Sequence, residues 1–200
     1  MLLIFYGARY IIKLMNVTAF TVLGTTAFVL FLILLYLWSA YNAFVTKRNQ
    51  VKTDYSDIDI QLKRRASLIE NLANLVKNYA THEKTTFEDV AKARSALDLS
   101  KTASDAAKAE NMLTQTLRSL FAVVEDYPKL QASQNFQQLR DDLKETENLI
   151  ARYREEYNQT VQQYNNLIQT FPNLLAAGLF RFDPEDLFQT TGSTEAPMIS

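Results

Sequence analysis

Between Gly24 and Pro128 the chain runs for 103 residues without a glycine or a proline. A proline inside a helix costs about 3 kcal/mol and a glycine about 1 kcal/mol, so their absence permits very long helices. This stretch begins inside an apolar run and continues into a charged, periodic region. The sequence therefore predicts a membrane segment that runs into a soluble helix without a hinge, as a rigid rod from about Ala19 to Tyr79.

The apolar run has the length of a membrane-spanning helix. Residues 14–46 carry no formal charge, and the densest apolar part is residues 19–38. About 20 apolar residues span a bilayer as a helix, whereas the apolar core of a cleaved signal peptide is only about 7–15 residues long. We expect a short N-terminal segment over residues 1–18 and one transmembrane helix over residues 19–41. Met15 is an alternative start to Met1.

Aromatic and basic residues mark the C-terminal end of this span, as is usual at a membrane–water interface. The candidate membrane-interface residues are Tyr36, Trp38, Tyr41, Lys47 and Arg48. More basic residues follow the span than precede it, where only Arg9 and Lys13 lie. By the positive-inside rule, this excess favours a cytoplasmic body with the N-terminus outside.

The charge and the cysteine count exclude several function classes. The chain has 21 basic and 22 acidic residues, and residues 47–200 carry 19 and 22 of them, a net charge of −3. A mildly acidic body is a poor candidate for binding nucleic acid through its phosphates. With no cysteine, the chain has no disulfide and no thiolate nucleophile or metal ligand.

Three heptad-spaced stretches, of the kind found in coiled coils, predict helices that pack together. Their seams are Val51, Tyr55, Ile58, Leu62, Ile69, Leu72, Val76 and Tyr79; Leu113, Leu117, Leu120 and Val124; and Leu139, Leu143, Thr146, Ile150, Tyr153, Tyr157, Thr160, Tyr164, Leu167 and Phe171. Thr102 and Ser133 are expected to cap the second and third helices, and Pro172 and Gly178 to close the third.

No segment shows the alternation of a β-strand. We therefore expect an all-α fold in which the transmembrane helix continues into an antiparallel helical bundle over residues 42–182. Beyond that bundle the chain becomes polar and contains Pro184, Gly192 and Pro197. Residues 183–200 are predicted to form a disordered tail.

One charged residue falls on the seam of the first helix. Arg65 occupies a heptad position that otherwise holds apolar residues, and a buried arginine needs a carboxylate partner. Glu147, next to the seam of the last helix, is the first candidate, and Asp59 is an intrahelical alternative. Such a pair would fix the register between helices. The alternative is that Arg65 reaches the surface, with its charged end in water.

The neighbouring Arg64 belongs to a basic triplet, residues 63–65. This triplet could bind anionic lipid headgroups or the carboxylates of a partner protein. In a straight helix it lies about 26 Å beyond Thr46, and this distance disfavours lipid.

Two tyrosine–asparagine pairs lie one heptad apart on the last helix. They are Tyr157-Asn158 and Tyr164-Asn165, with the tyrosines on the seam. A buried tyrosine contributes packing area and a hydroxyl group that needs a partner. A structural role is favoured over ligand binding, and the asparagines are expected to hydrogen-bond a neighbouring helix or a second protein.

The order of short motifs along the chain resembles the LemA family over residues 41–182. The motifs are Tyr41-Asn42, Ile58-Asp59-Ile60-Gln61-Leu62-Lys63-Arg64-Arg65, Leu68-Ile69, Asn71-Leu72, Val76-Lys77, Tyr79-Ala80, His82-Glu83, Ala93-Arg94, Glu125-Asp126-Tyr127-Pro128, Asn135-Phe136, Thr146-Glu147-Asn148, Tyr157-Asn158, Tyr164-Asn165 and Phe171-Pro172. Glu70 stands where the family pattern usually has proline. This removes the signal for a kink, so the sequence favours an unbroken first helix and argues against a function tied to a bend at this position.

This resemblance implies a bacterial inner-membrane protein with a four-helix-type bundle whose first and last helices are long. It does not imply a known reaction. Family members have proposed links to membrane metalloproteases, to envelope stress and, in some members, to the formation of membrane compartments.

The residues themselves predict no catalytic, metal or cofactor site. His82 is the only histidine, no HExxH motif occurs, and a zinc site needs several converging ligands. The first hypothesis is a non-enzymatic membrane scaffold or adaptor that binds a protein partner or a second copy. The alternative is a self-assembling protein that shapes a membrane compartment. An enzyme, or a regulator of a membrane metalloprotease, is a third.

Overall fold

The computed structural model describes residues 2–80 and 84–189, with side chains from Thr18 onward. Helix α1, Leu2–Lys77, is a single helix of 76 residues, which corresponds to a length of about 114 Å. It continues through Glu70 without interruption, so the prediction of an unbroken first helix is confirmed. The helix ends two residues before the expected Tyr79, which lies outside it and is 45% exposed.

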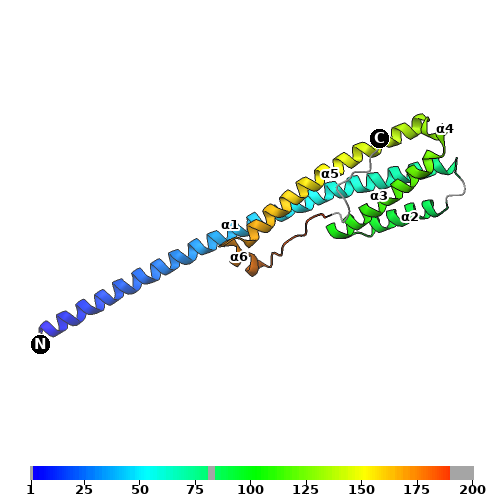
Figure 1. Cartoon of the computed structure of the whole chain (residues 1–200). Coiled ribbons are helices and arrows are strands. Elements are labelled where there is room, and N and C mark those ends of the chain that lie inside the picture. The colour runs from blue at the N-terminus through cyan, green and yellow to red at the C-terminus, as the bar shows by residue number, and fades with distance from the viewer. Residues whose placement is uncertain (1, 81–83, 190–200) are drawn as a thin grey trace.

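The N-terminal half of α1 stands away from the rest of the molecule (Figure 1). The described part, Thr18–Lys77, contains one window long and apolar enough to cross a membrane, with a mean hydropathy of 2.3 and none of its residues buried. The first buried side chains along α1 are Ala40 and Phe44. Within the described residues there is therefore one candidate membrane-spanning helix, which emerges directly from the bundle.

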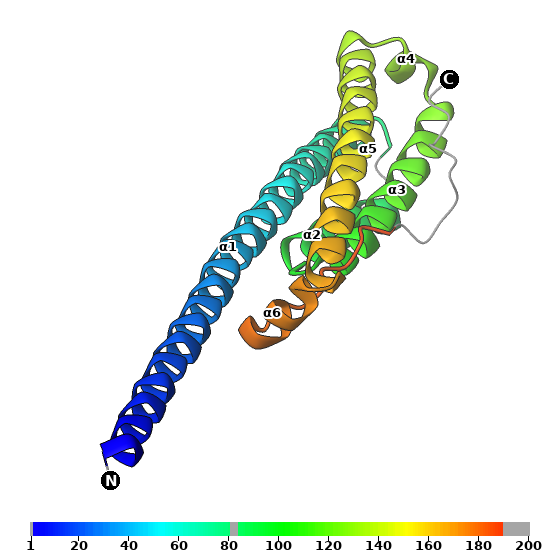
Figure 2. The ribbon, with the colours of Figure 1, turned by 90° about the vertical axis from the view of Figure 1, so that its left-hand side faces the viewer.

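The C-terminal half of α1 packs in a bundle with five further helices of the described chain. They are α2 (Lys84–Asp98), α3 (Ala103–Glu125), α4 (Pro128–Gln131), α5 (Gln134–Gln169) and α6 (Asn173–Phe180). The long helices α1 and α5 lie side by side, and α2 and α3 pair with each other and lie against α1 (Figures 1 and 2). No strand occurs in the described residues. The predicted all-α fold with long first and last helices is confirmed.

Most residues of the predicted seams form the core, because each seam presents an apolar stripe to the other helices. Seam side chains that are 0% exposed include Ile58, Leu62, Ile69, Leu72, Val76, Leu120 and Tyr164. The prediction is wrong at the end of the third seam, where Val161 and Ile168 are buried in place of Thr160 and Leu167, and Phe171 is 81% exposed. A straight helix drifts from a strict seven-residue repeat, which moves the buried face over successive heptads. Both predicted caps form as well. The Thr102 and Ser133 side chains accept hydrogen bonds from the backbone N–H groups of Asp105 and Phe136, three residues further on.

Two helices differ from the predicted pattern. The seams did not include α2, because its buried stripe of Thr86, Val90, Ala93 and Leu97 contains small and polar residues that give a weak apolar signal. At the other end, the chain does not stop at Pro172. It forms α6 directly after this proline, and Gly178, expected to close the preceding helix, lies inside α6.

The C-terminal segment corrects the prediction of a disordered tail for residues 183–189. These residues, called the strap below, run without regular secondary structure and are held against α5 by hydrogen bonds. Phe188 is 2% exposed and belongs to the core. The polar composition of the segment misled the prediction, because its binding partners are side chains of α5. The rest of the predicted tail, residues 190–200, lies outside the described residues, as does His82.

Candidate functional site

The two tyrosine–asparagine pairs of α5 bind the strap through its main chain. The Asn158 amide donates to the carbonyl oxygen of Phe188 at 3.2 Å and accepts from the Phe188 N–H at 2.8 Å. The Asn165 amide makes the same two bonds to Glu185, both at 2.9 Å. Each asparagine side chain therefore pairs with both the N–H and the C=O group of one strap residue. In a β-sheet, the backbone of a neighbouring strand makes this pair of hydrogen bonds.

The tyrosines complete the same arrangement, which we call the clasp: Tyr157, Asn158, Tyr164 and Asn165. The Tyr157 hydroxyl donates to the carbonyl oxygen of Asp186 at 2.8 Å, and the Tyr164 hydroxyl donates to that of Asp183 at 3.0 Å. Burial raises the pKa of Tyr157 to about 12, with Glu185 adding to the effect, and burial also raises the pKa of Tyr164. Both hydroxyls are thus held in the protonated, donating form.

The heptad spacing of the clasp matches the repeat of an extended chain. Seven helical residues rise about 10.5 Å, and three extended residues, from Glu185 to Phe188, span about 10 Å. The asparagine earlier in α5 binds the later strap residue, so the strap runs antiparallel to α5. Sequence analysis expected these asparagines to bind a helix or a second protein. Instead, they bind a segment of their own chain. The two asparagines contact main-chain groups of an extended segment and not its side chains.

A second polar site lies inside the bundle. Arg65 is 1% exposed, and its Nη2 lies 2.9 Å from Glu147 Oε2 and 3.2 Å from Thr114 Oγ1. The predicted contact between Arg65 and Glu147 is therefore present. Asp59 is not part of it, because its carboxylate pairs with Lys63 at 2.7 Å.

Two further charges complete this buried cluster. Glu110 Oε1 lies 3.3 Å from Arg154 Nη1 and 3.9 Å from Arg65 Nη1. Burial raises the pKa of Glu110, although the two guanidinium groups act in the opposite direction. The cluster, Arg65, Glu110, Glu147 and Arg154, joins α1, α3 and α5 and contains two charges of each sign. Its net charge is therefore zero, which suits a structural role.

Glu110 and Arg154 were not predicted from the sequence. Glu110 had a readable signal, because it lies three residues before Leu113 and so falls on the seam of α3, as Arg65 falls on the seam of α1. Arg154 is adjacent to the seam residue Tyr153, one heptad after Glu147, so the signal that pointed to Glu147 could have found it as well. The remaining candidate, Arg64, makes an exposed ion pair with Glu145 at 3.3 Å.

Most of the predicted membrane-interface residues contact the end of the bundle that lies nearest the apolar part of α1. Lys47 Nζ donates to Gln163 Oε1 at 2.6 Å, and Arg48 Nε lies 3.3 Å from Glu185 Oε1 in the strap. Trp38 differs, since it is 67% exposed.

The two interface tyrosines contact α6 and the residues that follow it. The Tyr36 hydroxyl donates to Asn173 Oδ1 at 2.7 Å. The Tyr41 ring packs edge-on against Phe180 and Phe182, with ring centroids 5.1 and 5.8 Å apart. These residues thus connect the membrane segment to the C-terminal elements.

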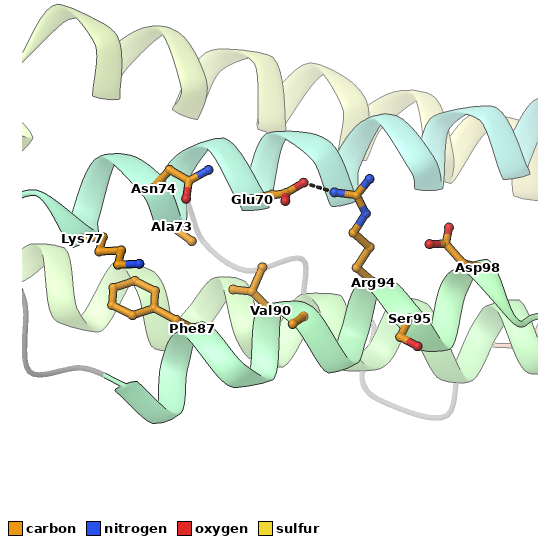
Figure 3. A pocket seen from close by; sticks show the side chains of 10 residues that line it. Glu70, Ala73, Asn74, Lys77, Phe87, Val90, Arg94, Ser95 and Asp98 are labelled. Carbon is orange, nitrogen blue, oxygen red and sulfur yellow. Dashed lines mark hydrogen bonds and ion pairs between the residues drawn. The ribbon is translucent and has the colours of Figure 1, made fainter.

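An open cleft of about 340 Å³ lies between α1 and α2 (Figure 3). Its lining residues are Glu70, Ala73, Asn74, Lys77, Phe87, Val90, Ala91, Arg94, Ser95 and Asp98. Glu70 and Arg94 face each other across it and form an ion pair. The two charges at the centre of the cleft therefore satisfy each other. Within residues 18–80 and 84–189, no three His, Cys, Asp or Glu side chains converge as metal ligands.

Comparisons of the sequence with known proteins identify similar proteins and a family. The chain is 25% identical to the magnetosome protein MamQ of Magnetospirillum gryphiswaldense over 208 residues, which cover 91% of this chain and 75% of the relative. It is 26% identical to MamQ 1 and to MamQ 2 of Paramagnetospirillum magneticum over 206 residues, 90% of this chain and 74% of each relative. The sequence pattern of the LemA family matches residues 54–200, which include the whole clasp, the strap and the buried charge cluster. The chain belongs to the LemA family.

Proposed function

We propose that this protein is a non-enzymatic, single-pass membrane scaffold that acts through protein–protein contacts of its helical bundle. The observation that carries the proposal is the continuity of α1 from the exposed apolar segment into the bundle core. Because no loop separates the two parts, the position and direction of the bundle follow those of the membrane helix. Such a connection suits a protein that presents a binding surface at a fixed height above a bilayer.

The polar sites support a structural role rather than a catalytic one. The buried charge cluster is neutral and closed in by α1, α3 and α5, and the clasp is occupied by the strap. Catalytic groups need a reachable site in which a substrate can sit. In the described residues, these side chains hold the protein's own elements together.

A second candidate function is the organisation of a membrane compartment by lateral self-assembly. It is supported by the similarity to the MamQ magnetosome proteins over nine tenths of the chain. In that case the partner is a second copy of this chain. The two candidates share the same rigid architecture and differ only in what the bundle contacts.

We also propose that the bundle lies in the bacterial cytoplasm. Lys47, Arg48 and Lys52 lie within about 20 Å of Trp38 along α1, on the side of the membrane where the bundle begins. Positively charged residues close to a span favour the cytoplasmic side.

Single-cysteine crosslinking in native membranes tests the scaffold function directly, because the natural chain has no cysteine. Cysteine is introduced at the exposed positions Ile60 and Met112, which are 55% and 38% exposed. The membranes are treated with a bifunctional thiol reagent, and the crosslinked proteins are identified by mass spectrometry. The buried position Leu62, which is 0% exposed, serves as the control that must not react.

A dominant adduct with a foreign protein would support the adaptor form of the scaffold, and mainly homodimeric adducts would support self-assembly. If Ile60→Cys and Met112→Cys react with a small thiol reagent but give no protein adduct, and a wider set of exposed positions behaves alike, the proposal is wrong.

A further inference from the structure

The short helix α6 lies at the end of the bundle that faces the apolar part of α1 (Figures 1 and 2). It is fixed there at both ends. Its first residue, Asn173, accepts the hydrogen bond from Tyr36, and its last residue, Phe180, packs against Tyr41. The strap follows α6 in sequence and is held by the clasp, so the position of α6 is set by α1 and α5 together.

The two faces of α6 have different surroundings. Ala176 and Ala177 are 2% and 3% exposed and pack against the bundle. The outer face carries large apolar side chains that the bundle does not cover: Phe171 just before the helix is 81% exposed, and Leu174, Leu175 and Leu179 are 53%, 68% and 65% exposed. A cluster of this kind on a protein surface marks a contact with another molecule or with a membrane.

The height of α6 along α1 identifies what covers this face. A span over residues 19–38 has the thickness of a bilayer core, about 30 Å, and Tyr36 lies within the last turn of that span. The hydrogen bond from Tyr36 therefore places the start of α6 at the boundary between acyl chains and headgroups. The first charged residues of α1 beyond this level, Lys47 and Arg48, lie about 16 Å further along the helix.

The charge pattern of the C-terminal region also fits a position of α6 at the boundary between acyl chains and headgroups. Residues 157–180 form a run of 24 residues without a formal charge, and the run ends at Arg181. Arg181 is exposed and follows directly after α6. Apolar side chains next to a basic residue are typical of helices that lie in the membrane interface.

We propose that α6, with Phe171, is a second membrane contact of this protein. Its leucine face lies in the interfacial region of the bilayer, beside the point where α1 leaves it. A single spanning helix can rotate about its own axis and tilt, whereas a second contact on one side of it restricts both motions. The clasp and the strap act in this arrangement by holding α6 against α1, so that the bundle has one orientation relative to the membrane.

Site-directed spin labelling of the full chain tests this contact. Cysteine is introduced at Leu175, labelled with a nitroxide and reconstituted into vesicles of phosphatidylethanolamine and phosphatidylglycerol. Collisions with oxygen, which concentrates in the acyl region, are compared with collisions with a water-soluble nickel chelate. The position Phe31, in the apolar part of α1, gives the reference value for lipid.

Leu99 provides a matched control for water exposure, since it is also a leucine and is 74% exposed. It lies in the connection between α2 and α3, where the Thr102 carbonyl accepts a hydrogen bond from Tyr55. Tyr55 is about 26 Å beyond Trp38 along α1, so Leu99 is far from the bilayer. Thermal unfolding of both labelled variants, followed by circular dichroism, checks that the bundle is intact.

We expect the ratio of oxygen to nickel accessibility at Leu175 to be severalfold higher than at Leu99 and close to the value at Phe31. A ratio equal to that of Leu99 would show that α6 is in water and would overturn the proposal. Low accessibility to both reagents at Leu175 would show that a protein surface covers α6, and this result would also overturn it.

Discussion

The two halves of α1 have the same secondary structure and opposite surroundings. In the described part of the N-terminal half, from Thr18 to Ser39, consecutive large apolar side chains are exposed, and Leu32 and Ile33 are 48% and 47% exposed. In the C-terminal half, Ile58 and Leu62 are 0% exposed, while Ile60 between them is 55% exposed. The absence of glycine and proline after Gly24 allows the helix to continue into the bundle, and the arrangement of apolar residues decides whether lipid or protein surrounds it.

The two halves of α1 therefore make different contributions to the orientation of the bundle relative to the membrane. A helix that is apolar all round binds a bilayer without a preferred face, whereas a helix with a single seam has one fixed direction relative to its partners. Among the described side chains of α1, from Thr18 onward, the one buried charge is Arg65, and it lies in the C-terminal half. The N-terminal half therefore sets the height of the bundle above the membrane, and the C-terminal half sets the rotation of the bundle about the axis of α1.

The largest effect is expected from removing the buried charge of the C-terminal half. Arg65→Ala leaves the buried Glu110 and the neighbouring Glu147 without this guanidinium group, and breaking a buried ion pair costs about 3–5 kcal/mol of unfolding free energy. Denaturant unfolding in detergent micelles measures the loss. Arg64→Ala, which affects only an exposed pair, is the control, with an expected loss below about 1 kcal/mol.

A double-mutant cycle then tests whether Arg65 and Glu147 act as a pair. Their coupling energy is expected to lie between about 0.5 and 3 kcal/mol. If the free-energy changes of Arg65→Ala and Glu147→Ala simply add, the proposed role of this pair in fixing the helix register has no support.

The comparison of the two halves is tested by the same substitution in each. Leu62→Ala removes a fully buried side chain and should lower the free energy of unfolding of the bundle by about 2–5 kcal/mol. Leu32→Ala, in the lipid-exposed half, should leave the stability of the bundle unchanged. Equal losses at the two positions would mean that the N-terminal half is also packed against protein.

A smaller effect is expected from opening the clasp. Asn165→Ala leaves the N–H and C=O groups of Glu185 without their partners, at a cost of about 1–3 kcal/mol. Hydrogen exchange of the Glu185 amide should become faster by the corresponding factor. Asn166→Ala, at the exposed neighbouring position, should leave this exchange rate unchanged, and equal rates in the two variants would argue against the clasp.

The smallest predicted effect depends on pH. The pKa of Tyr157 is raised from 10.0 to about 12 in the folded protein, so the folded state holds this proton more tightly than the unfolded state does. The stabilisation is fully present below pH 10 and is lost as the pH rises through about 12.

Tyr157→Phe removes this group and serves as the comparison. The stability advantage of the natural protein over Tyr157→Phe, about 1 kcal/mol from one hydrogen bond, should shrink across that pH range. Denaturant unfolding at a series of pH values measures it, and a constant advantage up to the highest pH would show that Tyr157 does not titrate in this range.

The sequence predicted the parts of the molecule that repeat. The seams of α1 and α3, the seam of α5 as far as Tyr157, the caps at Thr102 and Ser133 and the contact between Arg65 and Glu147 follow from heptad positions or local capping patterns. The partners of the clasp could not be predicted, because the strap contributes backbone groups that have no sequence signal. The position of α6 depends equally on tertiary contacts, since its leucines resemble a short core helix when read without the rest of the fold.

The central claim is that the membrane segment and the bundle share one rigid helix. Pulsed electron–electron double resonance in vesicles measures the distance between spin labels at Leu32 and Ser56, two exposed positions of α1. Their separation of 24 positions along the helix predicts a single narrow distance distribution near 36 Å. A broad distribution, or one centred at clearly shorter distances, would show a bend or a hinge between the two halves and would contradict the claim.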